Sequence, residues 1–349
     1  MIKLLLTFVA GVFVTAVAFV AQPYLSLTPQ SEYASEAATQ AAAQVSETLA
    51  PHMIDLMTGD IETRRSILDT YFFAPKIALA RELYPVKEEP LEIDGVYTEV
   101  FIPVDGIPAH NTERVLINLH GGAFSIGART EGQLESIPVA HVAGIKVVSV
   151  DYRQGPEHRF PAGSEDVAIV YRYLLKRYQP SNIGIYGCSA GGMLTAQSVA
   201  WFDAHDLPQP GAIGIFCAGG GYVLGGDSDV ISDSFGSKLD GKNIVYFDGA
   251  DLNDPLVAPI TDSKLLSRFP HTLIINSTRD FTLSPALVTH QRLLSAGVES
   301  ELHVYEGLNH YFFADTELPE SRHVFNVISR FFNQHLGGSQ TTATTSEGV

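Results

Sequence analysis

Residues Ile183-Gly184-Ile185-Tyr186-Gly187-Cys188-Ser189-Ala190-Gly191-Gly192 decide the fold class of this 349-residue chain. The stretch opens with a short β-branched run, which predicts a buried strand over 183–186. A helical pattern follows from Met193 to Phe202. Between the two, Gly187 to Gly191 matches the pattern G-x-S-x-G, and a strand, a tight turn and a helix are the context in which such a serine is exposed. The pattern therefore indicates Ser189 as a candidate nucleophile.

Other short apolar runs, bounded by Gly, Pro or Asn, predict further strands. These runs are 96–101, 115–119, 146–150, 212–217, 273–276 and 302–305. Helical spacing occurs between several of them and after the last one, over 167–178, 284–296 and 320–335. Strands that alternate with helices imply a parallel sheet with right-handed crossovers. The predicted fold class is therefore α/β, with a mostly parallel sheet flanked by helices.

The segments on either side of this region have different patterns. Residues 34–90 show helical spacing without a strand signal, for example at Ile67, Leu68, Tyr71 and Phe72, and we expect a helical cap there. Residues 91–336 then form the α/β domain. Residues 337–349 are rich in Gly, Ser and Thr and lack large apolar side chains, which predicts a disordered tail.

The N-terminus has the pattern of a targeting signal. Met1-Ile2-Lys3 is followed by an uncharged, mostly apolar run over residues 4–21, near the lower end of the roughly 17–25 residues that span a bilayer. Residues 1–22 fit a signal peptide or an uncleaved anchor almost equally well, with 23–33 as a linker. A buried core helix is disfavoured because a polar stretch follows. We therefore expect an exported protein, periplasmic or secreted, or one tethered to the membrane through residues 4–21.

Composition narrows the range of partners. The chain has 22 Lys and Arg residues against 39 Asp and Glu residues, a formal net charge of −17. This balance argues against a nucleic-acid or anionic-membrane partner held by basic contacts. Cys188 and Cys217 are the only cysteines, so no disulfide framework is expected, and we predict two reduced thiols. Nothing in the sequence specifies an oligomeric state.

A second glycine-rich segment, His120-Gly121-Gly122-Ala123-Phe124, follows the predicted strand 115–119. Acyl transfer places negative charge on a carbonyl oxygen, and preorganised backbone N–H groups stabilise that charge. We expect the amides of Gly122 and Ala123 to donate there, together with the amide of Ala190 after the nucleophile. Gly121 would permit the turn.

A serine nucleophile needs a base, and the base needs a carboxylate to orient it. Asp280 follows the predicted strand 273–276, and His310 follows 302–305, so both lie at the carboxyl ends of strands. The order Ser, Asp, His is typical of α/β-hydrolases. Weaker candidates are the acids Asp254, Asp262 and Asp315 and the histidines His205, His290, His323 and His335, which lie on or beside predicted helices.

Five separated motifs resemble the hormone-sensitive-lipase-like branch of esterases, also called bacterial family IV. They are His120-Gly121-Gly122, Tyr152-Arg153-x-x-Pro156-Glu157-His158-x-Phe160-Pro161-Ala162-Gly163, Gly187-x-Ser189-Ala190-Gly191-Gly192, Asp254-Pro255-x-x-x-Pro259 and the Asp280/His310 pair. The resemblance covers about residues 90 to 335. It implies an eight-stranded α/β-hydrolase core, a cap formed by the N-terminal helices, and hydrolysis of small-molecule esters with short- to medium-chain acyl groups, without a cofactor.

The chain departs from the family pattern at three positions. Ala123 replaces the third glycine, Cys188 replaces the usual acidic residue before the nucleophile, and Ser284 replaces a second aspartate. None of these changes removes a triad member. The motif from Tyr152 to Gly163 is interpreted as structural.

Aromatic side chains that adjoin the catalytic segments, Phe124, Tyr222 and Tyr311, are candidate substrate contacts. No metal or nucleotide is expected, because zinc-type histidine spacing, a Walker lysine and a dinucleotide glycine pattern are all missing. Lactone, amide or formamide hydrolysis would use the same triad and remains an alternative. A ligand-binding receptor on an inactive hydrolase scaffold is disfavoured because all three triad residues are present.

Overall fold

A single eight-stranded sheet organises the computed structural model, which describes residues 31–221, 225–231 and 244–337. The strand order is β1-β2-β4-β3-β5-β6-β7-β8. The first two strands pair antiparallel and β2 pairs antiparallel with β4, whereas all other pairs are parallel. The strands are β1 (Val86–Ile93), β2 (Val96–Pro103), β3 (Val115–Leu119), β4 (Lys146–Val150), β5 (Ile183–Cys188), β6 (Ala212–Phe216), β7 (His271–Ser277) and β8 (Ser300–Tyr305). The predicted α/β class is confirmed.

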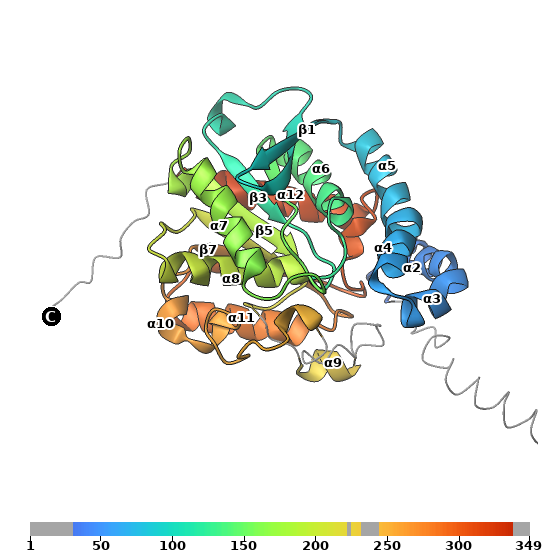
Figure 1. Cartoon of the computed structure of the whole chain (residues 1–349). Coiled ribbons are helices and arrows are strands. Elements are labelled where there is room, and N and C mark those ends of the chain that lie inside the picture. The colour runs from blue at the N-terminus through green and yellow to red at the C-terminus, as the bar shows by residue number, and fades with distance from the viewer. Residues whose placement is uncertain (1–30, 222–224, 232–243, 338–349) are drawn as a thin grey trace, which may run out of the picture.

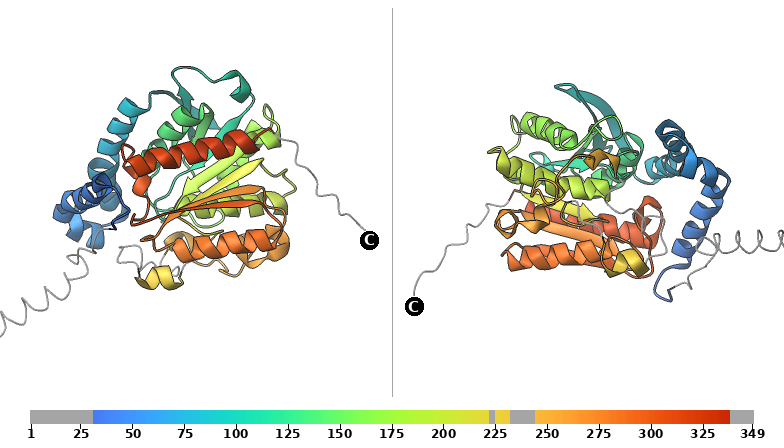
Figure 2. Two further views of the ribbon diagram at one scale, coloured as in Figure 1. Left: turned by 180° about the vertical axis from the view of Figure 1, so that it is seen from behind. Right: turned by 60° about the horizontal axis from the view of Figure 1, so that its bottom comes forward.

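Helices cover both faces of the sheet (Figures 1 and 2). On one face α6 (Thr130–Ala143) and α12 (Pro319–His335) enclose a buried cluster that includes Tyr186 and Phe216. On the other face α7 (Ala162–Leu174), α8 (Ala190–Ala204) and α11 (Leu283–Ser295) enclose a second cluster. Two short helices, α9 (Asp227–Ile231) and α10 (Ser263–Leu266), lie between β6 and β7 in the sequence.

The N-terminal helices form a group at one side of the molecule (Figure 1, blue). They are α2 (Glu36–Leu49), α3 (Met53–Thr58), α4 (Ile61–Ile67) and α5 (Ala74–Leu83), with a π-helical segment Leu68–Phe73 between the last two. Helix α5 packs against α6. The helices end at Leu83, so the segment 34–90, expected to be a helical cap, includes the start of β1.

Strand β1 has no counterpart among the predicted strands. Its sequence Val86-Lys87-Glu88-Glu89-Pro90-Leu91-Glu92-Ile93 is charged and contains a proline, and most of its side chains are exposed. The strand lies at the edge of the sheet, where one side of the backbone needs no partner, so proline and charges are tolerated. The strand was not predicted because strands were identified as apolar, β-branched runs, and an edge strand does not need that pattern.

The predicted segment 1–22, residues 23–30 of the predicted linker and the tail from residue 338 onward lie outside the described residues. Among the residues that the structure describes, no helix has both the length and the apolar character required to cross a bilayer.

Candidate active site

Ser189 occupies a sharp turn between β5 and α8. Its backbone φ is 56°, in the left-handed region that costs energy for a residue with a side chain. A Cβ atom on Gly191 would lie 1.7 Å from the carbonyl oxygen of Leu119, the last residue of β3. Glycine is therefore required there, because α8 begins in direct contact with the end of the neighbouring strand. This close approach places the serine beside the loop that leaves β3.

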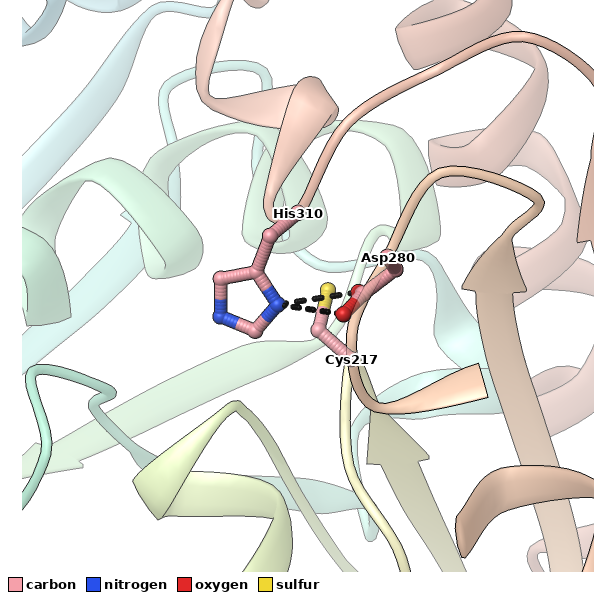
Figure 3. Close-up of side chains that lie close together, drawn as sticks. All are labelled: Cys217, Asp280 and His310. Carbon is pink, nitrogen blue, oxygen red and sulfur yellow. Dashed lines mark hydrogen bonds and ion pairs between the residues drawn. The ribbon is translucent and has the colours of Figure 1, made fainter. Parts of the chain in front are cut away.

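The three predicted triad residues lie together at the carboxyl ends of the strands. His310 Nε2 lies 3.0 Å from Ser189 Oγ. On the other side of the ring, Nδ1 lies 2.9 Å from each carboxylate oxygen of Asp280. Figure 3 draws both contacts as dashed lines. A continuous hydrogen-bonded chain thus runs from a hydroxyl through an imidazole to a carboxylate, and such a chain can take a proton from the hydroxyl.

The Asp280 carboxylate is completely buried. Its Oδ1 accepts hydrogen bonds from both the amide and the hydroxyl of Thr282, each at 2.8 Å. The Thr282 hydroxyl in turn accepts from Asn276 Nδ2 at 3.0 Å. These donors solvate a carboxylate that water does not reach, and they fix its orientation toward His310. Thr282 was not predicted from the sequence, where its only signal is a hydroxyl two residues after the candidate acid.

Two thiols lie near the hydrogen-bonded triad of Ser189, His310 and Asp280. Both cysteines are free and buried. Burial raises the pKa of the Cys217 thiol, and the negative charge of Asp280 raises it further. Burial also raises the pKa of Cys188. The side chain before Ser189 is therefore neutral, and so is the thiol beside Asp280 (Figure 3).

Two groups of candidate metal ligands occur in the described part of the chain. One, Cys217 with Asp280 and His310, overlaps the hydrogen-bonded chain itself. The other, His271 with Glu299 and His335, lies at the starts of β7 and β8 and the end of α12. Parallel strands place their starts at the opposite edge of the sheet from their carboxyl ends, so this second group is remote from Ser189.

The loop after β3 has an unusual backbone. Gly122, Ala123 and Phe124 are consecutive residues with φ of 87°, 52° and 55°. The Gly122 carbonyl accepts from the amides of Ser125 and Ile126, each at 3.0 Å, which closes the turn. The amides of Gly122 and Ala123 donate to no other residue in the described ranges, so both are available to a ligand. The Gly121 amide is not available, since it donates to Glu135 Oε1 at 3.2 Å.

The two candidate substrate contacts that the structure describes are buried. Phe124 is fully buried and stacks on Tyr246 with ring centroids 4.8 Å apart. Tyr311 is 8% exposed, and its ring packs edge-on against Phe313. Both rings therefore belong to the core in this structure. Tyr222 lies outside the described residues.

The motif from Tyr152 to Gly163 supports the loops around the site. The Tyr152 hydroxyl donates to the carbonyl oxygen of His120 at 2.7 Å. Arg153 pairs with the buried Asp166 of α7 at 2.9 Å. Arg65, on α4, donates to the carbonyl oxygens of Ser125 at 2.8 Å and Gly155 at 3.0 Å. The N-terminal helices are thus hydrogen-bonded to the segment that follows the His120 loop.

Comparisons with known proteins agree with this geometry. A family model described as alpha/beta hydrolase fold matches residues 116–314. The crystal structure of an esterase designated E25 is 31% identical, covers 88% of this chain and 96% of that chain, and superposes with a TM-score of 0.76. An esterase from the bacterial hormone-sensitive lipase family is 25% identical, covers 80% of this chain and 92% of that chain, and has a TM-score of 0.70.

Two curated relatives are also similar. An acetyl-hydrolase from Streptomyces hygroscopicus is 26% identical over 239 residues, which are 66% of this chain and 79% of the relative. Esterase LipU from Mycobacterium tuberculosis is 28% identical over 257 residues, which are 66% of this chain and 81% of the relative.

Proposed function

Because the chain belongs to the α/β-hydrolase family and is a hydrolase of the hormone-sensitive-lipase-like group, we propose that it hydrolyses carboxylic esters through an acyl-enzyme on Ser189. The observation that carries this proposal is the unbroken hydrogen-bonded chain from Ser189 through His310 to Asp280. Ester hydrolysis needs an activated nucleophile, and this chain supplies one.

In the first half of the reaction, His310 Nε2 accepts the Ser189 proton while Oγ attacks the ester carbonyl carbon. The imidazolium forms next to the Asp280 carboxylate, which stabilises its charge and holds the ring in the required tautomer. His310 then returns the proton to the leaving alcohol, and the acyl group stays on Ser189. In the second half, His310 takes a proton from water, the resulting hydroxide attacks the acyl-enzyme, and Ser189 recovers its proton.

The oxyanion of each tetrahedral intermediate needs donors that are already in place. The amides of Gly122 and Ala123 are unengaged in the described structure, and the amide of Ala190 is at the first position of α8. The N-terminus of that helix adds a partial positive charge. One such donor contributes about 2.7–4 kcal/mol to transition-state stabilisation. The methyl group of Ala123 would narrow the mouth of this site compared with glycine.

We propose short- to medium-chain acyl esters as the substrates. Similarity to an acetyl-hydrolase supports the short end of this range. Lactones and amides would react by the same steps, so a substrate panel separates these classes. We expect p-nitrophenyl acetate and butyrate to be cleaved at least tenfold more efficiently than the laurate ester, a lactone or an anilide, since a tenfold preference needs only about 1.4 kcal/mol.

Two variants accompany the panel. Ser189→Ala removes the attacking oxygen and should abolish turnover, whereas Asp254→Asn changes an aspartate outside the hydrogen-bonded chain and should retain it. Ester hydrolysis by folded Ser189→Ala would refute the acyl-enzyme.

We further propose that the protein is exported or anchored in a membrane through residues 4–21. The uncharged run in that segment supports the proposal. Treatment with signal peptidase followed by N-terminal sequencing distinguishes a new N-terminus near residue 22 from a retained anchor. A full-length chain found only in the cytoplasm contradicts both readings.

A further inference from the structure

Two buried glutamates lie behind the loop that follows β3. Glu131 and Glu135 are each 3% exposed. They are four residues apart on α6 and therefore on the same face of that helix. Neither forms an ion pair with a lysine or arginine of the described chain. Burying an uncompensated carboxylate is costly, so each of these two side chains must be hydrogen-bonded or protonated.

Glu135 connects the loop to the sheet. One carboxylate oxygen accepts from the Gly121 amide at 3.2 Å, and the other accepts from Asn118 Nδ2 at 2.8 Å. Asn118 Oδ1 accepts from Ser149 Oγ at 2.9 Å, so β3 and β4 hold the amide in place. The Glu135 backbone carbonyl accepts from the hydroxyl of Tyr186, in the strand β5 that leads to Ser189, at 3.4 Å. Glu135 therefore contacts both the loop after β3 and the strand that leads to Ser189.

Glu131 fills the space behind the loop. A Cβ atom on Gly121 would lie 2.2 Å from Glu131 Oε1. A Cβ atom on Gly127 would lie 2.7 Å from Glu131 Oε2. The carboxyl group thus lies against the backbone at both ends of the segment 121–127, and both glycines are needed to admit it.

The two carboxyl groups favour different protonation states. Burial raises the pKa of Glu131 to about 8. Burial and the nearby Glu131 charge also raise the pKa of Glu135, but Asn118 and the amides of Gly121 and Cys188 oppose this by favouring its charged form. Because both pKa values are raised and two neighbouring charges would repel each other, the pair carries at most one negative charge at neutral pH, and these donors favour that charge on Glu135.

The other titratable groups around the pair carry no compensating positive charge. Burial lowers the pKa of His120 to about 4, so its ring is neutral. Burial also raises the pKa values of the phenols and thiols that face the pair, namely Tyr152, Tyr186, Tyr311, Cys188 and Cys217. Asp151 adds negative charge near Tyr152 and is itself paired with Arg129.

We propose that Glu131 and Glu135 are positioning residues for the oxyanion hole. The Glu135 carboxyl group ties Gly121 to Asn118 of β3, and Glu131 supports the loop from behind while the pair carries no second negative charge. This inference rests on the proposed esterase function. Ionisation of Glu131 would place two like charges behind amides that stabilise an oxyanion, so the rate should fall as Glu131 loses its proton.

Three variants test the assignment: Glu135→Gln, Glu131→Gln and, as a matched control, Glu99→Gln. Glu99 is also half-buried beside α6 with a raised pKa, but its carboxylate accepts from Gln133 rather than from the loop. The assays are kcat and KM for p-nitrophenyl acetate from pH 6 to pH 9.5, inhibition by a trifluoromethyl ketone that forms an oxyanion on Ser189, and circular dichroism to confirm folding.

Glu135→Gln should lower kcat about tenfold or more with KM changed less than about twofold, and should weaken the ketone in proportion, as expected when oxyanion stabilisation is lost. Glu131→Gln cannot ionise, so it should keep its rate above pH 8, where the wild-type rate declines. Glu99→Gln should resemble the wild type in every assay.

Two results overturn the inference: folded Glu135→Gln with wild-type kcat and ketone affinity, or a Glu131→Gln rate that declines with the wild-type midpoint. If Glu135→Gln does not fold, the Glu131→Gln profile decides alone. A wild-type protein that hydrolyses no ester and does not react with a fluorophosphonate refutes the proposed function itself. An active wild type with indifferent glutamate variants refutes only the positioning role.

Discussion

Replacing Asp280 with asparagine tests the orientation of the catalytic base. The carboxylate is surrounded by donors: the Thr282 amide and hydroxyl, and His310 Nδ1. An asparagine side chain keeps the shape but must direct an NH2 group at one of these partners. Thr282 cannot reverse its amide, so the asparagine oxygen stays at the Oδ1 position and the NH2 group takes the Oδ2 position. That position lies 2.9 Å from His310 Nδ1, which would become the acceptor.

That reversal moves the ring proton to Nε2, which then points at Ser189 and cannot accept the hydroxyl proton. Loss of the correct tautomer in a serine-histidine-aspartate site lowers kcat by about 10⁴, which corresponds to about 5 kcal/mol. We therefore expect Asp280→Asn to lower kcat for p-nitrophenyl acetate by three to four orders of magnitude, roughly the size of that effect. KM should change little, because the geometry of the pocket is preserved.

The matched control is Asp254→Asn, since within the described part of the chain the Asp254 carboxylate accepts a hydrogen bond only from the nearby Leu256 amide. Thermal unfolding of both variants shows whether a loss of rate reflects a loss of structure. A folded Asp280→Asn enzyme with more than about a tenth of the wild-type kcat would contradict the orientation argument. So would an equal loss in Asp254→Asn.

Three further predictions concern stability. Gly191→Ala places a methyl group 1.7 Å from a carbonyl oxygen and should lower the free energy of unfolding in urea by about 3 kcal/mol or more. Its control, Gly297→Ala, lies in open space at φ of 82° and should cost about 1 kcal/mol. Equal losses in the two variants would contradict the crowding at Gly191. Arg65→Ala should lower the free energy of unfolding by about 1–3 kcal/mol, because two carbonyl oxygens lose a charged donor. The exposed Arg330→Ala should cost almost nothing. Calorimetry compares the two, and an Arg65→Ala protein as stable as the wild type would refute the stabilising role of Arg65. The free energy of unfolding of Glu131→Gln should rise relative to the wild type as the pH rises, by up to about 1.4 kcal/mol per pH unit between pH 4.5 and pH 8. The reason is that the folded wild type holds a proton that the unfolded chain releases. A difference that does not change with pH would mean that Glu131 is ionised throughout this range.

The central sheet was predictable from the sequence because its strands are buried on both faces. Strands β3 and β4 have the predicted bounds, 115–119 and 146–150. Such strands are continuous apolar runs, which sequence patterns reveal well. The candidate triad was predictable for a related reason: its members lie in the turns and loops that follow β5, β7 and β8, and parallel strands bring their carboxyl ends to one edge.

Helix α6 was not predicted, and with it the pair Glu131 and Glu135. The helix is buried on several sides, so it lacks the single apolar stripe of a surface helix, and Pro138 lies inside it. Its two buried glutamates look like solvent-facing residues in a pattern analysis. The orientation of Phe124 was also unpredictable, because its direction depends on three consecutive positive φ angles rather than on the residue type.

The most direct test of the account is covalent labelling of the nucleophile. The wild-type protein is incubated with a fluorophosphonate, digested, and analysed by peptide mass spectrometry, with Ser189→Ala and His310→Ala in parallel. The geometry predicts one adduct, on the peptide that contains Ser189, formed rapidly in the wild type, far more slowly in His310→Ala, and not at all in Ser189→Ala. Ester hydrolysis by a folded wild-type protein that gains no adduct, or an adduct on another serine that stops turnover, would contradict the assignment of Ser189 as the nucleophile.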